Sequence, residues 1–189
     1  MAFLIEWNLI SLDGYFEGAA KWDLEWHNYV WDAELEKFSV DQLHSAGMLL
    51  FGRITYEGMA AYWKNAKGEA AEFMNSMPKA VISRTLKEAD WNNTRVLRGG
   101  TVEEILKLKR ELTKDIFVFG SGALAATLTK ANLFDEYRLA VAPAVLGRGV
   151  TLFGRDLPRQ RLRLIDAKPL SSGVVILRYA PRPQTDAKK

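Results

Sequence analysis

Short apolar runs alternate along the chain with longer segments in which apolar residues recur every three or four positions. The runs are typical of buried strands, because a parallel strand covered on both faces carries nearly continuous apolar sequence. Five such strands are expected, at Phe3–Ile10, Met48–Phe51, Lys79–Ile82, Ile116–Phe119 and Tyr137–Val141.

The segments between these runs predict amphipathic helices. One helix carries an apolar stripe, with Leu43 beside it, formed by Trp31, Leu35, Phe38, Gln42 and Ala46. A second helix, Thr101–Leu112, opens with a capping box from Thr101 to Glu104. A third helix covers Gly122–Lys130.

Alternation of strands and helices predicts an α/β fold of three layers, α/β/α, with a mostly parallel central sheet. The last third differs, because Arg161–Ala167 and Val174–Tyr179 are extended and Ser171–Gly173 forms a turn between them. This pattern predicts a C-terminal antiparallel hairpin. We expect one domain over residues 1–180 and a flexible, proline-containing tail over residues 181–189.

The 189 residues are 48% hydrophobic and 26% charged, which is typical of a single soluble globular domain. The sequence contains no run of ~18 apolar residues and meets Glu6 too early for a secretory signal, so we expect no membrane partner and a cytoplasmic location. Cysteine is absent, which excludes disulfides, thiolate zinc sites and cysteine nucleophiles. No bound metal is expected.

The net charge of +3 is unevenly distributed. Residues 1–45 carry only Lys21 and Lys37 against nine acids, whereas residues 101–189 carry 16 basic and 9 acidic side chains. A nucleic-acid interface clusters more basic residues than this, so none is expected. A small anionic ligand between the acidic and basic parts is compatible with the pattern. One small basic patch, interpreted as a solvated strand face, is formed by Arg159, Arg161 and Arg163.

Three strand-to-helix junctions carry residues that suit a phosphate group. A glycine lets the backbone approach the ligand, the first turn of a helix presents unpaired N–H groups, and hydroxyl and guanidinium groups donate to the phosphate oxygens. The candidate residues are Gly52, Arg53, Ile54 and Thr55 at one junction, Ser83, Arg84 and Thr85 at the second, and Gly120, Ser121, Gly122 and Leu124 at the third.

Each junction also has a simpler interpretation. A Gly-x-Gly turn often does no more than begin a helix, and Arg53 could be an ordinary surface cation. A cation at a helix N-terminus is nevertheless electrostatically unfavourable unless an anion binds there. Three such junctions in one sheet favour a phosphate-binding edge.

The loop after the first strand carries the candidate substrate site. Ser11 and Gly14 flank Asp13 there, and the following segment, which includes Trp22 and Trp26, is rich in aromatic and acidic residues. Aromatic faces with a few acids suit a flat heteroaromatic ligand. The alternative is that the tryptophans pack against the sheet or a partner subunit.

In this order, the motifs resemble the dihydrofolate reductase-like superfamily, and most closely the reductase domain of riboflavin biosynthesis, the C-terminal half of a bifunctional deaminase-reductase. The resemblance covers residues 3–179 and is carried by Ser11–Gly14, Leu50–Glu57, Phe119–Gly122 and Asp135–Leu139, the last continuing through Ala142–Gly147. It implies a dihydrofolate reductase-like fold and a stand-alone NADPH-dependent reductase.

The resemblance also implies roles for the junction residues. It places Gly52, Arg53 and Thr55 under the dinucleotide and Gly120, Ser121 and Gly122 at its pyrophosphate. It places Ser83 and Arg84 at the 2′-phosphate that distinguishes NADPH from NADH. Paired guanidiniums would favour that extra dianion.

The resemblance implies hydride transfer to a C=N or C=O bond of a small flat or phosphorylated substrate. It places the Asp13 loop toward the nicotinamide and the substrate, so Asp13 is the first candidate to orient the substrate or to donate the proton, directly or through water, and Glu25 is the second. Burial among aromatic residues is expected to raise the donor's pKa. The Trp-Pro-type loop of dihydrofolate reductase is absent, which indicates a substrate other than folate, and these 189 residues, without cysteine, cannot carry the zinc deaminase motif.

Two further expectations accompany this interpretation. A non-catalytic nucleotide-binding protein that retains the fold is the alternative function. Because sheet edges invite pairing and twofold dimers are the commonest assembly, a homodimer is expected.

Overall fold

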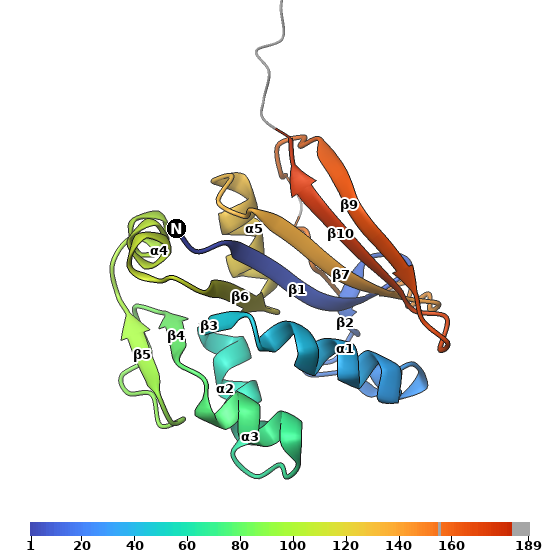
Figure 1. Cartoon of the computed structure of the whole chain (residues 1–189), viewed down its shortest axis with the longest axis horizontal. Helices are drawn as coiled ribbons and strands as arrows, with labels where there is room; N and C mark the ends of the chain where they lie inside the picture. Colours follow the sequence, from blue (N-terminus) through green and yellow to red (C-terminus); the bar gives the residue numbers. More distant parts are fainter. Residues whose placement is uncertain (155, 183–189) are drawn as a thin grey trace, which may run out of the picture.

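The computed structural model describes residues 1–154 and 156–182. Its centre is an eight-stranded sheet in the order β5-β4-β3-β6-β1-β7-β10-β9 (Figure 1). The strands are β1 (Leu4–Ser11), β3 (Ala46–Gly52), β4 (Lys79–Ile82), β5 (Thr94–Leu97), β6 (Asp115–Phe119), β7 (Glu136–Ala142), β9 (Leu162–Pro169) and β10 (Val175–Pro181). The strands from β5 to β7 are parallel, and β10 pairs antiparallel with β7 and with β9. The predicted α/β fold with a C-terminal hairpin is confirmed.

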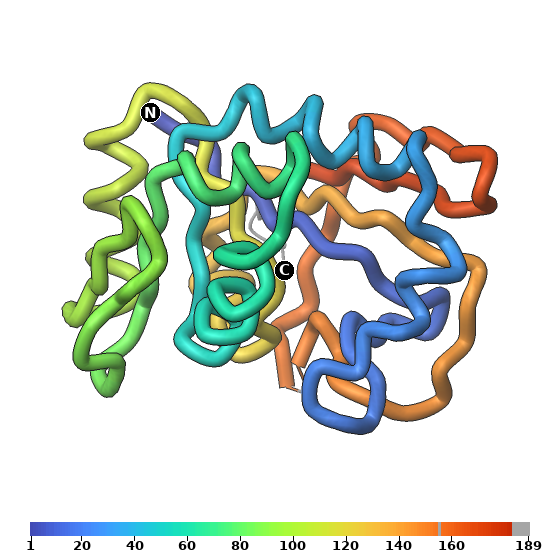
Figure 2. The backbone as a smooth tube through the Cα atoms, turned by 90° about the horizontal axis from the view of Figure 1, so that it is seen from below, coloured from blue at the N-terminus to red at the C-terminus, as the bar shows by residue number. Residues whose placement is uncertain are grey.

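Helices cover the two faces of the sheet. They are α1 (Ala33–Leu43), α2 (Arg53–Trp63), α3 (Glu69–Ser76), α4 (Thr101–Glu111) and α5 (Gly122–Lys130), with a short 3-10 helix η1 (Glu25–Tyr29) before α1. Figure 2 shows α1 and α5 on opposite sides of β1. Trp7 packs with the α1–α3 layer, whereas Leu4 packs with α4 and α5, because alternate side chains of a strand point to opposite faces. No helix among the described residues has the length and apolarity needed to cross a membrane.

The first predicted helix is too long at both ends. Asp32 is the N-cap of α1, and its Oδ1 accepts a hydrogen bond of 2.8 Å from the Leu35 N–H. Trp31 therefore precedes the helix. Ala46 begins β3. The side-chain spacing continued through both residues, but the cap and the following strand set the boundaries.

The predicted capping box at α4 is wrong. The N-cap is Gly100, and Thr101 is already the first helical residue, so its hydroxyl is not at the capping position. Glu104 instead accepts a 3.1 Å hydrogen bond from the N–H of Gly99. The helix ends at Glu111, one residue before the predicted end.

The C-terminal hairpin continues beyond the predicted domain end. Pro181 is the last residue of β10, and the Arg182 N–H donates to the Arg161 carbonyl at 2.8 Å. The rest of the expected tail, residues 183–189, lies outside the described residues.

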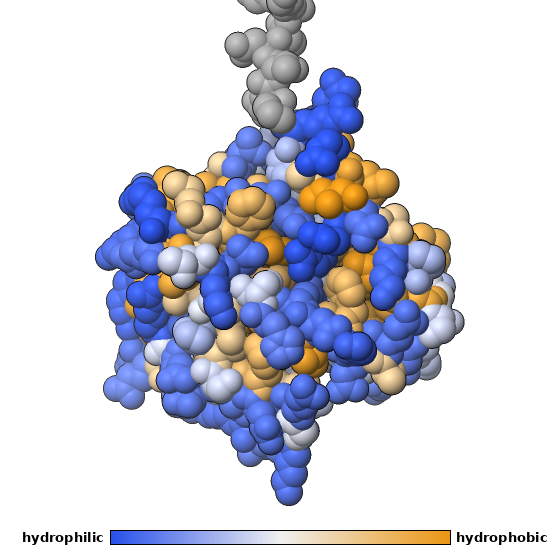
Figure 3. Space-filling model, viewed as in Figure 1, coloured by the Kyte–Doolittle hydropathy of each residue, from blue (hydrophilic) through white to orange (hydrophobic). Residues whose placement is uncertain are grey.

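Strand β9 forms one edge of the sheet and is exposed along its whole length. Apolar residues gather at the upper right of Figure 3, over this hairpin, and the large apolar side chains exposed on β9 are those of Leu162, Leu164 and Ile165. An exposed edge strand is able to pair with a second chain. The homodimer stays a prediction.

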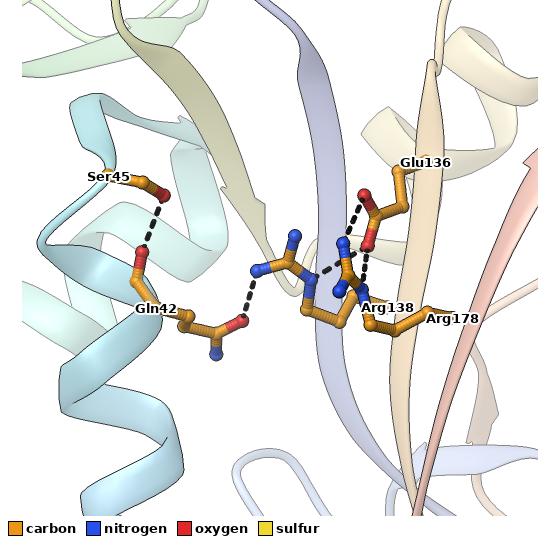
Figure 4. Close-up of polar contacts among 5 residues, drawn as sticks. All are labelled: Gln42, Ser45, Glu136, Arg138 and Arg178. Carbon is orange, nitrogen blue, oxygen red and sulfur yellow. Dashed lines mark hydrogen bonds and ion pairs between the residues drawn. The ribbon is translucent and has the colours of Figure 1, made fainter. Parts of the chain in front are cut away.

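A buried ionic network ties the hairpin to β7 and α1 (Figure 4). Glu136 accepts hydrogen bonds from Arg138 Nε at 2.9 Å and from Arg178 Nε at 2.6 Å, and Arg138 donates to Gln42 Oε1 at 3.1 Å. Although burial raises the pKa of Glu136, the two guanidiniums hold it below its ordinary value. The network joins three elements that are distant in sequence.

Candidate functional site

Two of the predicted phosphate junctions meet at one edge of the sheet. Because β3 and β6 are parallel neighbours, their carboxyl ends bring the starts of α2 and α5 together. A Cβ atom on Gly52 would overlap the hydroxyl oxygen of Ser121, and one on Gly120 would lie 3.1 Å from Thr55 Cγ2. We call residues 52–55 and 120–122 the glycine corner. Side chains at Gly52 and Gly120 would fill the space between the two helix starts.

The backbone of the glycine corner is suited to an anion. Gly120 and Ser121 both adopt left-handed conformations, with φ of +56° and +63°. A left-handed serine is strained, and such strain concentrates at functional sites. Gly52 and Ser121 are the N-caps of α2 and α5, and neither makes a side-chain capping hydrogen bond. The first N–H groups of the two helices are therefore available to a ligand.

Asn8, on strand β1, forms a hydrogen bond to the glycine corner, and the sequence did not predict this role. Its side-chain oxygen accepts a 3.1 Å hydrogen bond from the Gly120 N–H, and its side-chain nitrogen donates to Glu6. The contact depends on strand register between distant segments. The available signal was a polar pair, Glu6 and Asn8, within an otherwise apolar buried strand.

The third junction lies beside the glycine corner. Gly52 is in register with Ile82, so Arg53 and Ser83 follow directly at the ends of neighbouring strands. Ser83 is buried, and its hydroxyl accepts hydrogen bonds from the N–H groups of Thr85 at 3.2 Å and Leu86 at 2.9 Å. Ser83 therefore shapes the turn rather than offering a free hydroxyl.

The two candidate arginines differ in their contacts. Arg53 forms an ion pair with Glu57 at 2.9 Å, one helical turn further along α2. Arg84 is exposed, and within residues 1–154 and 156–182 it makes no ion pair or side-chain hydrogen bond. Arg84 is therefore the more available cation at this edge.

The remaining candidates of the three junctions lie in different surroundings. Ile54 and Thr85 are exposed. Leu124 is 6% exposed and packs in the core under α5. Its side chain is thus a packing residue, and its backbone belongs to the first turn of the helix.

The loop after β1 is braced by Asp13. Asp13 Oδ1 accepts hydrogen bonds from the Ser11 hydroxyl at 2.6 Å and from the Leu146 N–H at 3.1 Å, and Oδ2 accepts from the Gly147 N–H at 2.8 Å. The Ser11 hydroxyl is the main reason that the pKa of Asp13 lies below its ordinary value. Gly14 has a φ of +87° and completes the turn. These contacts favour an ionised Asp13 that stabilises the loop, rather than an Asp13 that donates a proton.

In the aromatic segment that follows the Asp13 loop, some side chains pack in the interior and others are exposed at the surface. The Trp22 ring lies against Gly58 of α2, where a Cβ would overlap the indole. Trp26 is 5% exposed and belongs to the core, which matches the packing alternative rather than the ligand one. Glu25 and Asp13 are exposed, so the expected burial of these acids among aromatic residues is not found. In contrast, burial lowers the pKa of the neighbouring His27 to about 4.

A small second sheet connects the Asp13 loop with the glycine corner. It pairs β2 (Tyr15–Glu17) with β8 (Val150–Thr151). A Cβ on Gly122 would lie 3.1 Å from the Thr151 carbonyl oxygen and 3.2 Å from the Phe16 ring. The candidate cofactor and substrate segments are therefore adjacent.

The hollow at the opposite, amino-terminal edge of β3–β5 is not this site. It has a volume of about 610 Å³, and Lys79, Trp91 and Arg95 are among its lining residues. Lys79 is fully buried, donates to the Met77 carbonyl at 2.6 Å and lies 4.6 Å from the centre of the Trp91 ring. Lys79 therefore caps the end of α3 and packs the core.

The sheet order and the two helix layers define an α/β domain with the dihydrofolate reductase-like fold. Over residues 2–176 the chain matches the RibD C-terminal domain, and it belongs to that family.

The chain is similar to several known proteins. It is 32% identical over 175 residues to the uncharacterized protein YyaP of Bacillus subtilis (strain 168), covering 90% of each chain. Its structure resembles that of a Shewanella sp. PV-4 protein assigned to riboflavin biosynthesis, with a TM-score of 0.81, 22% identity and coverage of 96% of this chain and 99% of that one. It also resembles dihydrofolate reductase from Enterococcus faecalis, solved in complex with NADP(H) and RAB-propyl, with a TM-score of 0.64, 14% identity and coverage of 95% and 96%.

Proposed function

We propose that this protein is an NADPH-dependent reductase acting on a small heteroaromatic or phosphorylated substrate. The observation that carries the proposal is the glycine corner, where two uncapped helix N-termini meet over glycines whose Cβ atoms would fill the space between them. The family and the NADP(H) complex of a protein with the same fold support the choice of cofactor.

The residues of the glycine corner fit a dinucleotide diphosphate. Backbone N–H groups at the starts of α2 and α5 would hold its oxygens, because the positive ends of two helix dipoles favour a dianion there. Arg84, exposed at the end of β4, would hold the additional 2′-phosphate. NADPH, when bound, supplies a hydride to a C=N or C=O bond of the substrate.

In this proposal the chain orients the substrate and limits its movement. Asp13 fixes the loop around Leu146 and Gly147 against the turn after β1, which gives the substrate a rigid boundary. Because Asp13 is a charged hydrogen-bond acceptor and Glu25 is exposed, we assign the proton-donor role to water rather than to either acid.

Ser121 provides a sharp test of cofactor binding. An aspartate at a helix N-cap stabilises the helix, and Asn and Asp both tolerate the left-handed conformation of position 121. Ser121→Asp adds a negative charge at the proposed diphosphate site, whereas Ser121→Asn adds the same volume without charge.

The measurement is the NADPH dissociation constant, followed by quenching of tryptophan fluorescence. Wild type and Ser121→Asn are expected to bind NADPH, and Ser121→Asp is expected to lose at least about tenfold in affinity while its melting temperature is maintained. Equal NADPH affinity in the two variants would contradict a diphosphate at the glycine corner. Binding without turnover of any substrate would favour the non-catalytic alternative.

A further inference from the structure

Glu6 and Asn8 form a buried polar pair within the apolar layer beneath α5. Glu6 is fully buried and Asn8 is 9% exposed. Their neighbours in register on β6 and β7 include Val118 and Tyr137, which belong to the apolar cluster under α4 and α5. A buried carboxyl and a buried amide are costly to desolvate, so their retention requires a compensating role.

The hydrogen bonds of Asn8 have a fixed direction. The Gly120 N–H can only donate, so the oxygen of the Asn8 amide must face it, at 3.1 Å. The amide nitrogen then faces Glu6, whose Oε1 accepts its hydrogen bond. Glu6 and the Gly120 N–H therefore select the same orientation of the amide, one at each end. A reversed amide would place two donors against each other at Gly120.

The N–H that Asn8 binds belongs to Gly120, the first residue of the left-handed turn. Gly120 and Ser121 adopt positive φ angles in succession, and Ser121 is the N-cap of α5. Tertiary contacts must maintain such a strained turn. The Asn8 oxygen accepts from Gly120, which leaves the N–H groups of the first turn of α5 to a ligand.

We infer that Glu6 and Asn8 are positioning residues for the cofactor: Glu6 orients the Asn8 amide, and Asn8 fixes the Gly120 turn so that the start of α5 is preformed for the diphosphate. This inference rests on the proposed function. Burial raises the pKa of Glu6 well above its ordinary value, which favours the uncharged acid. An uncharged acid accepts from Asn8 without repelling a phosphate. Its second oxygen, Oε2, has no hydrogen-bond partner among the described residues.

The test separates positioning from packing. Glu6→Met replaces the acceptor with an apolar side chain of similar length and leaves the buried Asn8 amide N–H without a partner, which costs stability. Glu6→Gln keeps a carbonyl oxygen that can accept from Asn8. Asn8→Leu removes the contact with Gly120 itself. Ser39→Ala, a buried hydroxyl in α1 on the other face of the sheet, is the matched control.

NADPH dissociation constants and melting temperatures are measured for the full chain and each variant. We expect Glu6→Met to lower the melting temperature while staying folded at the temperature of the binding assay, and to weaken NADPH binding by at least about fivefold, with a similar weakening in Asn8→Leu. Glu6→Gln and Ser39→Ala are expected to bind within about twofold of wild type.

Wild-type affinity in Glu6→Met or in Asn8→Leu would overturn the inference while leaving the proposed function intact. A large loss of affinity in Glu6→Gln would overturn the acceptor role of Glu6, even if the other variants failed to fold. No NADPH binding by the wild type would overturn the proposed function, and this inference with it.

Discussion

Gly52 and Ser121 begin different helices, on opposite faces of the sheet, yet a single Cβ atom at Gly52 would overlap the Ser121 hydroxyl oxygen. The backbone of Gly52 therefore lies directly against the Ser121 side chain, and the starts of α2 and α5 are in close contact. Gly52 has a φ of −79°, so its backbone could accept a side chain, and the restriction comes from its neighbour.

A compensating pair of substitutions tests this contact. Gly52→Ala is expected to lower the free energy of unfolding by about 1–3 kcal/mol through overpacking, and to weaken NADPH binding. Ser121→Gly removes the overlapping hydroxyl and also suits the left-handed conformation, so the double variant is expected to recover most of the stability. Urea unfolding of the four proteins measures the coupling, and strictly additive effects would show that the two positions are independent.

The choice between NADPH and NADH is expected to depend on Arg84. Arg84→Ala should weaken NADPH binding about tenfold, because a charge-assisted hydrogen bond to phosphate contributes ~1.5–3 kcal/mol, and should leave NADH binding unchanged. Arg110→Ala, an exposed arginine near the end of α4, is the control. Equal losses for the two cofactors would refute a 2′-phosphate at Arg84.

Asp13 is expected to control the order of the loop around residue 146. Asp13→Asn replaces a charged acceptor of three hydrogen bonds with an amide whose NH₂ group opposes the backbone donors. Hydrogen exchange at the Leu146 and Gly147 amides is therefore expected to become faster, without a change in NADPH affinity. Unchanged exchange at these two amides would mean that Asp13 does not brace the loop.

Lys79 is expected to make stability depend on pH in the alkaline range. Burial lowers its pKa from 10.5 to about 8, so between these values the unfolded chain holds the proton that the folded chain has released. The unfolded state then binds more protons, and stability rises with pH across this window. Relative to Lys79→Met, wild type should gain at most about 3 kcal/mol between pH ~8 and ~10.5. A difference between the two proteins that stays constant with pH, measured by urea unfolding, would contradict the buried-lysine interpretation.

The sequence predicted the strands that lead into the site because each is a buried apolar run followed by a glycine or a hydroxyl residue. It missed β5, whose four residues are half-exposed or exposed and form no apolar run. The short pair β2 and β8 was missed for the same reason.

The geometry of the candidate site could be predicted where it depends on residues adjacent in sequence, but not where it depends on the register between distant strands. Gly52 and Gly120 were recognised from their own neighbours in sequence. The support from Asn8 requires β1 to lie beside β6, and the role of Asp13 requires the loop at Leu146 to fold back onto the turn after β1. No periodicity encodes either contact.

The most direct test of the central claim is a crystal structure with NADP⁺ bound. We expect the diphosphate to lie between the N–H groups that begin α2 and those that begin α5, within hydrogen-bond distance of the Gly120–Gly122 backbone, with Arg84 on the 2′-phosphate. A dinucleotide bound elsewhere, or a glycine corner filled by side chains in the complex, would contradict the proposed function.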